Sequence, residues 1–510
     1  MIVGKGIFNI LDFGAVGDGK NVDTRAIQKA VDDCAKLGGG VVLFPPGTYI
    51  CGTIFLKDNV CIELQHACTV LINRDEDDIC EPEELPYNTH ADVETSYFRW
   101  ALFMGQDVDN IAITGTGLIE GNSYGRGGPK PIALKSCSNV HIRGITIRNA
   151  PNYAISMIDC EYVIIDGVRI HDALADGIDP DNCRNVVISY CIVESHDDAI
   201  CPKTSPALGK ISFCANIAVS NCLLATNCNC FKLGTETSGD FRNISLSNCT
   251  MYPLGYGRAP TSGIALESVD GANLNGIAIS NISMQGVDWP IFIRLGNRGR
   301  AQDIPTPGSI TNISLHNIVD ENAKMPSIIS GIVNHRIQHI QISNLRVNYP
   351  RMGAEDMGAV KIGLDIPEGV EKYPDPNMFG ELPVSGWLIR HAEDISIEHT
   401  NFQFVKGDLR SAIILTDCIG LKYYNSTMGW SNTFDKMPLS HKMERLPLLW
   451  INECQDIRFT ENKLNCLLEN TPRIRITGET SKNIQFKGSD FESNTRSEEH
   501  TSELQSPNTI

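Results

Sequence analysis

The chain has little that would mark a metal-binding, disulfide-stapled or membrane-spanning protein. Its 18 cysteines include no two CxxC pairs at zinc-site spacing. No stretch approaches the roughly 18 apolar residues of a membrane span, and residues 1–9 lack the basic and apolar regions of a signal peptide. We therefore expect no metal, no cofactor and no membrane partner. The chain is expected to be cytoplasmic as written, or secreted or periplasmic if its start is truncated.

Basic residues are also scarce. Lys and Arg total 43 against 61 Asp and Glu, a net charge of −18. This balance excludes a nucleic acid partner, because phosphate binding needs a basic surface. It also disfavours a polyanionic substrate unless a local basic patch lines the site. Hydrophobic residues make up 42% of the chain, enough to bury a sizeable core. We expect the chain to act as a monomer.

A short pattern of alternating apolar residues recurs along the chain, usually opened by Asn or Asp. It reads NVHIRGITIRNA from Asn139 and NIAVSNCLLATN from Asn216. Further copies begin at or near Asn110, Tyr162, Asn185, Asn243, Gly276, Asn312, His339, Asp394, Asp456 and Asn483. Alternation with period two indicates strands rather than helices. The starts at Asn139, Tyr162 and Asn185 are evenly spaced, and each interval leaves room for two or three short strands and their turns.

One such coil cannot bury its apolar face alone, so neighbouring coils must stack. The sequence therefore predicts an all-β protein, a single right-handed parallel β-helix. A leucine-rich solenoid is the competing fold, but the LxxLxL signature is absent from the sequence. The recurrent asparagines fit a ladder of side-chain amides along the stack. Cys191, Cys222 and Cys249 recur at repeat positions and are predicted to be small buried fillers of the solenoid. So many unpatterned thiols suit a reducing compartment slightly better than an oxidising one.

The ends of the chain differ from the repeat. We expect residues 1–70 to form an N-terminal cap with a helix over about 23–37, opened by Asp23 as its N-cap and ended by Gly38–Gly40. The solenoid is expected over 71–495, with a Pro- and Gly-containing insertion at about 350–388. Residues 496–510 are polar and similar to a translated sequencing-library adapter, so they are expected to be an artefact tail.

The densest chemistry lies in LADGIDPDNC and SHDDAICPKT. Asp176 precedes Asp197 and Asp198 by slightly less than the interval between the repeat starts at Tyr162 and Asn185. One coil therefore places Asp176 beside the Asp197–Asp198 pair on the adjacent strand, ~4.8 Å away. Crowded carboxyl groups raise at least one pKa and supply a protonated acid next to an ionised base. Glycoside hydrolysis needs that combination.

The same aspartates have structural alternatives. Asp-Gly and Asp-Pro turns are common, and a calcium ion also binds carboxylates. For Asp179 and Asp181 we favour a turn or calcium role. For Asp176, Asp197 and Asp198 we favour catalysis, because turn capping does not predict their register of one coil.

These motifs, together with DFGAVGDG at Asp12–Gly19 and FPPGTY after the predicted helix, resemble glycoside hydrolase family 28, the polygalacturonase-type pectinases. The resemblance covers roughly Phe8 to Phe491. It implies an inverting hydrolase that cuts α-glycosidic bonds in a pectin-type glycan, with no cofactor. It also implies Asp197 as general acid, with Asp176 and Asp198 activating water. Inverting enzymes separate the two carboxyl groups by ~6.5–9.5 Å, so the side chains must splay from the narrow strand spacing.

Two departures from the family pattern concern the substrate. Where the family has Gly-His-Gly, this chain has Cys228–Cys230, with Asn229 in the histidine position. The interval from Asp198 to Asn229 equals the local coil spacing, so Asn229 still faces the site. Where the family has a substrate-gripping Arg-x-Lys, this chain has Ala265 and Glu267. A glutamate cannot hold a galacturonate carboxylate, so plain polygalacturonan is in doubt as the substrate.

Other side chains are candidates to compensate. We expect Lys203 and Lys232 to contact the substrate, because they lie on the coils that carry the site. Arg294, in the segment FIRLGNRGR, and His196 are further candidates, although such residues are more often surface charges or turn residues. The segments FKLGTETSGDFRNI, LESVDG and PIFIRLGNRGR look like a bacterial branch of the family. A rhamnogalacturonan-type or oligosaccharide substrate is therefore a second candidate.

Three functions remain open at this point. The first is the glycosidase. The second is a polysaccharide lyase on the same fold, which needs a base and cations at the uronate and leaves an ultraviolet-absorbing product. The third is a non-catalytic carbohydrate-binding β-helix, because this fold does not fix function.

Overall fold

The structure is a computed structural model that describes residues 6–350, 363–405, 408, 410–430, 446–465 and 473–490. The chain divides into two compact units, residues 1–258 and 259–510, and each is described by itself. The predicted artefact tail and part of the predicted insertion, residues 351–362, lie outside the described residues.

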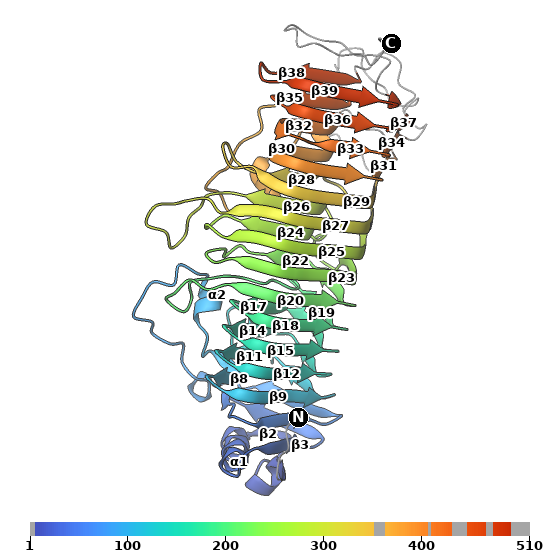
Figure 1. The fold of residues 1–510 in the computed structure, drawn as a ribbon. Helices are drawn as coiled ribbons and strands as arrows, with labels where there is room; N and C mark the ends of the chain where they lie inside the picture. Colours follow the sequence, from blue (N-terminus) through green and yellow to red (C-terminus); the bar gives the residue numbers. More distant parts are fainter. Residues whose placement is uncertain are drawn as a thin grey trace, which may run out of the picture. The chain divides into compact units, whose positions relative to one another are not determined.

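Three columns of parallel strands build the first unit, and most coils contribute one short strand to each column (Figure 1). The first column consists of β1 (Ile7–Asn9), β3 (Gly40–Phe44), β6 (Val60–Leu64), β9 (Asp109–Gly115), β12 (Ser138–Arg143), β15 (Glu161–Asp166), β18 (Arg184–Ser189), β20 (Cys214–Ser220) and the start of β23 (Phe241–Pro253). The second consists of β2 (Asp18–Val22), β4 (Gly47–Cys51), β7 (Cys68–Ile72), β10 (Leu118–Glu120), β13 (Thr146–Arg148), β16 (Arg169–Ala173), β19 (Ile192–Ser195), β21 (Leu223–Thr226) and the end of β23. The third consists of β5 (Ile54–Phe55), β8 (Ala101–Gln106), β11 (Lys130–Lys135), β14 (Ile155–Ile158), β17 (Ile178–Asp181) and β22 (Asn229–Leu233). The predicted right-handed parallel β-helix is confirmed.

The even spacing of the repeat appears directly in the strand register. Val140 pairs with Val163, and Val163 pairs with Val186, each one coil further along the chain. These valines are buried, whereas the residues directly before and after each valine on its strand are exposed or partly exposed. Alternation along each strand therefore converts the repeat into continuous apolar columns inside the solenoid.

The predicted asparagine ladder is present. The side-chain amide of Asn243 donates to Asn216 at 2.8 Å, and that of Asn216 donates to Asn185 at 2.8 Å. These three residues have φ between 53° and 57°, in the left-handed region. Asparagine tolerates this conformation better than most residues, which explains its recurrence where each coil begins a new strand.

Cysteines also stack inside the solenoid. Cys191, Cys222 and Cys249 are at most 2% exposed, which confirms that they are buried fillers. Every cysteine of the described ranges is free of disulfide bonds. Burial raises the pKa of most of these thiols, Cys68 and Cys160 among them, so their reactivity is low.

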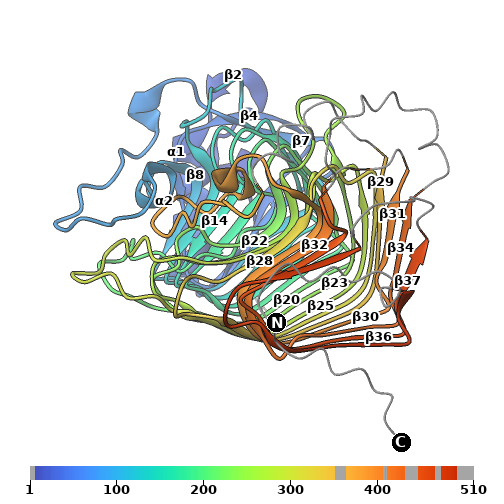
Figure 2. The same cartoon turned by 90° about the horizontal axis from the view of Figure 1, so that it is seen from above.

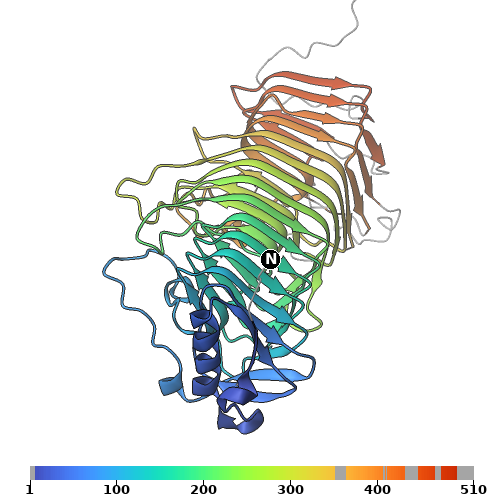
Figure 3. The same cartoon turned by 60° about the horizontal axis from the view of Figure 1, so that its bottom comes forward.

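A helix caps the N-terminal coil of the first unit, as predicted. Helix α1 (Thr24–Lys36) buries Ile27, Val31 and Cys34 against the first strands (Figures 1 and 3). Asp23 stands at the N-cap position, but its side chain does not cap the helix. Its carboxylate accepts instead from the backbone N–H groups of Val16 and Gly17, at 2.7 and 3.2 Å, so it closes the preceding loop. In the part of the chain described here, no helix is long and apolar enough to cross a membrane.

The loops of the first unit carry the remaining helical turns. They are η1 (Ile10–Phe13), η2 (Glu76–Asp78) and α2 (Val93–Ser96). Residues 73–100, between β7 and β8, form the longest connection of this unit and contain η2 and α2. A second connection, residues 121–129, joins β10 to β11. Both connections contribute to the site described below.

The second unit repeats the parallel architecture with described strands of 3 to 15 residues. They are β24 (Ser262–Ser268), β25 (Asn273–Gln285), β26 (Trp289–Leu295), β27 (Ser309–Glu321), β28 (Ser327–Ser330), β29 (Ile337–Tyr349), β30 (Val384–Glu398), β31 (Asn401–Phe404), β32 (Ser411–Ile419), β33 (Lys422–Tyr424), β34 (Thr427–Trp430), β35 (Leu449–Asn452), β36 (Gln455–Thr460), β37 (Lys463–Asn465), β38 (Ile474–Thr477) and β39 (Lys482–Lys487). Viewed from above, β31, β34 and β37 lie side by side, in agreement with their pairing (Figure 2). The described part of the predicted insertion contains η3 (Pro376–Phe379), with Phe379 packed against β26 and β28.

Asp320 on β27 gives a test of this packing. It is fully buried, and neither carboxylate oxygen has a hydrogen-bond partner among the described residues. Burial raises the pKa of Asp320 to about 8. The folded state therefore holds a proton that the unfolded chain releases near pH 4, so stability falls as pH rises from about 4 to about 8.

We expect Asp320→Asn to remove this pH dependence. Each pKa unit corresponds to ~1.4 kcal/mol, so the wild type should lose several kcal/mol relative to the variant over that interval. Thermal unfolding of both proteins between pH 5 and 8 measures the difference. Glu371→Gln, a change at an exposed acidic residue of the same unit, serves as the control. Parallel curves for wild type and Asp320→Asn would contradict the assignment.

Candidate active site

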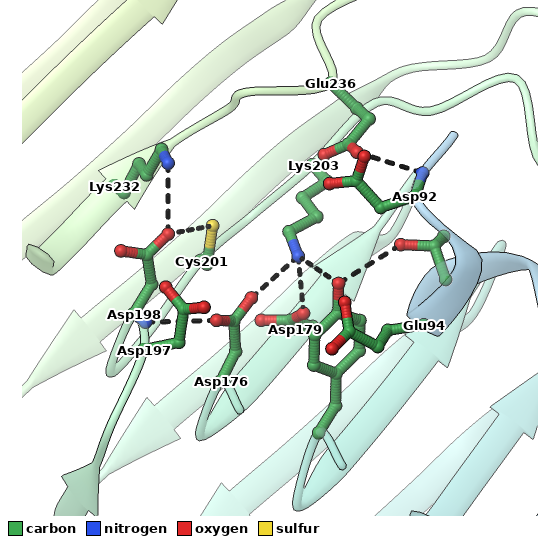
Figure 4. Close-up of polar contacts among 12 residues, drawn as sticks. Asp92, Glu94, Asp176, Asp179, Asp197, Asp198, Cys201, Lys203, Lys232 and Glu236 are labelled. Carbon is green, nitrogen blue, oxygen red and sulfur yellow. Dashed lines mark hydrogen bonds and ion pairs between the residues drawn. The ribbon is translucent and has the colours of Figure 1, made fainter. Parts of the chain in front are cut away.

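The candidate site of the first unit lies where three consecutive coils enter the third column of strands. Asp176 precedes β17, Asp197 and Asp198 follow β19, and Asn229 opens β22. Bridges from Ile178 to Ile200 and from Ile200 to Phe231 keep these coils in parallel register. The structure thus brings together the aspartates whose spacing predicted their proximity, as Figure 4 shows. Their catalytic roles stay predictions.

Close approach of two coils depends on Gly177. A Cβ atom at this position would lie 2.3 Å from Cγ1 of Val193 and 2.5 Å from the carbonyl oxygen of Ala199. The N–H of Gly177 donates to the carbonyl oxygen of Asp198 at 2.9 Å, and the N–H of Asp198 donates to the Asp176 carboxylate at 3.0 Å. The backbone at Asp198 therefore fixes the Asp176 carboxylate of the preceding coil.

Lys203 joins two of the buried carboxylates. Its ammonium lies 2.7 Å from Asp176 and 2.7 Å from Asp179, and it donates to the hydroxyl of Tyr153 at 3.1 Å (Figure 4). The ammonium also stands 4.1 Å from the centroid of the Tyr153 ring. All four side chains are buried, so these charges interact without screening by solvent.

Burial and mutual charge determine the protonation of Asp176, Asp179 and Lys203. Burial and the neighbouring Asp179 carboxylate raise the pKa of Asp176 well above its ordinary value, and burial also raises the pKa of Asp179. Burial lowers the pKa of Lys203, but the two carboxylates outweigh it and raise that pKa. One ammonium cannot neutralise two carboxylates, so the pair keeps a proton to higher pH than isolated aspartates.

Asp198 has the opposite environment. Its carboxylate accepts from the backbone N–H and the side-chain amide of Asn229, at 3.0 and 2.7 Å. The ammonium of Lys232 lies 3.1 Å away. Burial alone would raise the pKa of Asp198, but Lys232 and Asn229 outweigh it and lower that pKa. Asp198 is therefore an ionised carboxylate, suited to act as a base.

Asp197 is the most accessible of the three aspartates. Its side chain is 28% exposed, and one oxygen lies 2.8 Å from the guanidinium of Arg126. The same guanidinium reaches Glu94 of α2 at 2.8 Å. The Asp197 backbone is held by the hydroxyls of Ser195 and Thr226, which donate to its carbonyl oxygen. A fixed backbone with an open side chain suits a group that must meet a polymer.

The predicted substrate contacts Lys203, Lys232 and Asn229 lie in the site but serve the carboxylates. Their exposed fractions are 4%, 3% and 5%, and each is bonded to Asp176, Asp179 or Asp198. Their expected contact with the substrate stays a prediction. A buried aspartate needs a compensating charge or donor, and these residues supply it.

The remaining predicted contacts are placed differently. His196 lies next to Asp197 in sequence, and its Nε2 is 2.6 Å from Asp172, which also accepts from the hydroxyl of the exposed Tyr256. Arg294 belongs to the second unit, where it is buried and donates to Ser330 and to backbone carbonyls of residues 331, 368 and 369. Its predicted role in substrate binding stays a prediction.

From the sequence, we favoured a turn or calcium role for Asp179 and did not predict Tyr153 in the site. Asp179 binds Lys203, whereas Asp181 accepts from the backbone N–H of Ser205 at 2.8 Å, as a structural residue would. Tyr153 precedes Asp176 by one coil spacing, and this spacing was the signal that would have found it. Arg126 and Glu94 lie in irregular connections, and no repeat marks them.

Among the residues that the structure describes, two groups of side chains have the geometry to hold a metal ion. Oxygens of Asp176 and Asp198 and the sulfur of Cys201 lie within 4.8 Å of one another, as do those of Asp197, Asp198 and Cys228. The buried carboxylates of these groups, Asp176 and Asp198, are already paired with Lys203 and Lys232. A thiol is also a poor ligand for calcium, so this donor set does not fit the calcium alternative.

Comparison with known proteins identifies the family. A sequence model described as "Glycosyl hydrolases family 28" matches residues 84–361, more than half of the chain. The chain belongs to this family. A second model, "Rhamnogalacturonase A/epimerase, pectate lyase-like", matches residues 7–63. Membership of family 28 makes the chain a glycosidase and disfavours the lyase and the non-catalytic binding protein.

Relatives and solved structures agree with family 28. A "Probable polygalacturonase" of Vitis vinifera is 26% identical over 409 residues, which cover 74% of this chain and 81% of that protein. An exopolygalacturonase structure from Thermotoga maritima matches at 22% identity with a TM-score of 0.56, covering 68% of this chain and 87% of that one. A family 28 exopolygalacturonase from Yersinia enterocolitica matches at 19% identity with a TM-score of 0.62, covering 82% and 78%. At these identities the structures show the fold alone.

Loss of Lys203 should destabilise this family 28 chain. Lys203→Met leaves Asp176 and Asp179 buried without their cation, and breaking a buried pair costs about 3–5 kcal/mol. Denaturant unfolding at pH 7 measures the loss, which should shrink as the pH is lowered, because the raised pKa values of Asp176 and Asp179 let these carboxyl groups take up protons. Lys210→Met is the control, because Lys210 is 61% exposed and lies 3.4 Å from Asp159. Equal effects of the two changes would contradict the buried ion pair.

Proposed function

We propose that this chain is an inverting glycosidase that hydrolyses α-glycosidic bonds of a pectic, galacturonate-containing glycan. The observation that carries the proposal is the contrast between adjacent carboxyl groups. Asp197 faces solvent, whereas Asp198 is buried and kept ionised by Lys232 and Asn229. Glycoside hydrolysis uses such a pair, one group as acid and the other as base.

The proposed reaction takes one step at the sugar. Asp197 gives a proton to the glycosidic oxygen as the bond from this oxygen to the anomeric carbon breaks. Asp198 removes a proton from a water molecule as its oxygen bonds to the opposite face of the anomeric carbon. Asp197 ends ionised and Asp198 protonated, and exchange with solvent restores both.

Asp176 supports Asp198 in this scheme. It accepts the backbone N–H of Asp198 and holds the next coil in place through Gly177. Its raised pKa keeps a second negative charge away from Asp198. We assign Asp176 to orienting the attacking water together with Asp198, with Lys203 and Tyr153 fixing the position of Asp176.

The names of the relatives support the substrate class, because they include polygalacturonases. Another relative is the "Exo-poly-alpha-D-galacturonosidase" of Dickeya chrysanthemi. It is 24% identical over 252 residues, which cover 38% of this chain and 41% of that protein. Ala265 and Glu267 occupy the positions of the family's substrate-gripping cations. Because of the names of the relatives we propose galacturonate-containing oligosaccharides as substrates. Because the two cations are missing, rhamnogalacturonan fragments are the second class to test. His196, beside Tyr256, is a candidate contact for the sugar.

Asp197→Asn should abolish hydrolysis without unfolding the protein. Loss of a general acid lowers kcat by about 10²–10⁴-fold. Release of reducing ends from a panel of pectic polymers and oligomers measures it. Asp166→Asn is a matched control, since Asp166 is 24% exposed and pairs with Arg143 at 2.9 Å, much as Asp197 pairs with Arg126. Full activity of Asp197→Asn would show that another group is the acid.

The anomer formed first tests inversion. Oxygens of Asp197 and Asp198 lie within 4.8 Å, which is closer than the expected separation of ~6.5–9.5 Å between carboxyl groups. We expect proton NMR during the first turnovers to show the β-anomer from an α-linked substrate. Appearance of the α-anomer would indicate a covalent intermediate and a retaining mechanism.

We also propose that the chain acts as a monomer, without a nucleic acid or membrane partner, because Asp176, Asp197, Asp198, Lys203 and Lys232 all come from one chain. Light scattering during size-exclusion chromatography should give the mass of one chain, 56.0 kDa.

A further inference from the structure

The proposed active site is rich in negative charge. Figure 4 shows Asp92, Glu94, Asp176, Asp179, Asp197, Asp198 and Glu236 around two lysines. Both lysines are buried and bonded to the aspartates. A substrate that carries a carboxylate on each sugar would be repelled by such a site unless an accessible cation offset the charge.

Arg126 is an accessible cation at this place. Its side chain is 48% exposed, and its Nη2 lies 2.8 Å from the carboxylate of Asp197. Its Nε lies 2.8 Å from Glu94, whose α2 ribbon borders the site in Figure 4. Glu94 therefore holds the guanidinium through Nε, and one terminal nitrogen, Nη2, meets Asp197. A guanidinium can bind a carboxylate with two parallel hydrogen bonds.

The pairing with Asp197 conflicts with the proposed chemistry. A general acid must carry a proton, whereas a carboxylate in an ion pair with an arginine is the ionised form. Arg126 must therefore change partner before Asp197 acts. A carboxylate of the substrate offers the same charge and geometry as that of Asp197, so exchange leaves the charge on the guanidinium paired throughout.

We propose that Arg126 is the specificity-determining residue for a uronate substrate, exchanging its contact with Asp197 for the carboxylate of the bound sugar while Glu94 holds it in place. This proposal rests on the proposed function, because it assumes that Asp197 is the acid. It assigns to the connection of residues 121–129 the task that the family gives to the Arg-x-Lys positions, here Ala265 and Glu267. The substrate's own charge then releases Asp197, so that neutral sugars activate the acid less well.

The test compares charged and neutral forms of one substrate. Trigalacturonate and its methyl ester are given to wild type, Arg126→Ala and Arg126→Lys. Arg126→Ala should lower kcat/KM on trigalacturonate by about 10–100-fold, mainly through KM, because a hydrogen-bonded ion pair to the substrate is lost. On the methyl ester activity should not fall, because Arg126 has no substrate carboxylate to bind there and its loss frees Asp197. Arg126→Lys should recover part of the loss on trigalacturonate.

Arg143→Ala, which removes another exposed arginine paired with an aspartate, should leave both substrates unaffected. Equal losses of Arg126→Ala on the charged and the neutral substrate would overturn the proposal, since a structural role predicts them. Undiminished activity on trigalacturonate would overturn it as well.

Binding separates this proposal from the proposed function. Calorimetry with trigalacturonate measures affinity whether or not the bond is cut, and Arg126→Ala should weaken it about 10–100-fold. If wild type binds trigalacturonate but Asp197→Asn hydrolyses as fast as wild type, the proposed acid is wrong while the role of Arg126 in binding stands. If Arg126→Ala binds as tightly as wild type, the role of Arg126 is wrong whatever the outcome for Asp197.

Discussion

Parallel stacking of coils in register is the constraint on which the rest of the first unit depends. Each residue lies beside the one that follows it by one coil, so Val140, Val163 and Val186 form one apolar column. The same rule applied to outward-facing residues places Asp176 against Asp198 and Asp198 against Asn229. A stack that buries its core thus aligns its polar residues at the same time, and a site arises where three successive coils carry complementary groups.

Charge compensation decides what those groups do. Lys203 and Lys232 are buried, and each stands against aspartates that would otherwise be isolated charges. Because Lys203 serves two carboxyl groups and Lys232 serves one, Asp176 and Asp198 differ in pKa although they are neighbours. The division between a protonated and an ionised group is therefore set by the ratio of lysines to aspartates, and both residue types are supplied by adjacent coils.

The sequence allowed prediction of features that follow from periodicity. The fold, the asparagine ladder, the buried cysteines and the proximity of Asp176 to Asp198 all depend on a spacing that can be read along the chain. The burial of Lys203 could not be predicted, because a lysine is usually exposed and its partners come from another coil. Arg126 and Glu94 could not be predicted as site residues for a different reason. They lie in irregular connections, and the path of such a connection depends on the whole fold.

The two connections, residues 73–100 and 121–129, join strands without belonging to the repeat. Tight stacking resists change on the coils, as the absence of space for a side chain at Gly177 illustrates. Loops tolerate insertions and substitutions far better. With the roles proposed for Arg126 and the aspartates, sugar preference depends on these connections and hydrolysis on the coils, so the two properties can evolve at different rates. A new pectic substrate could be acquired, or engineered, by grafting these two connections onto unaltered coils.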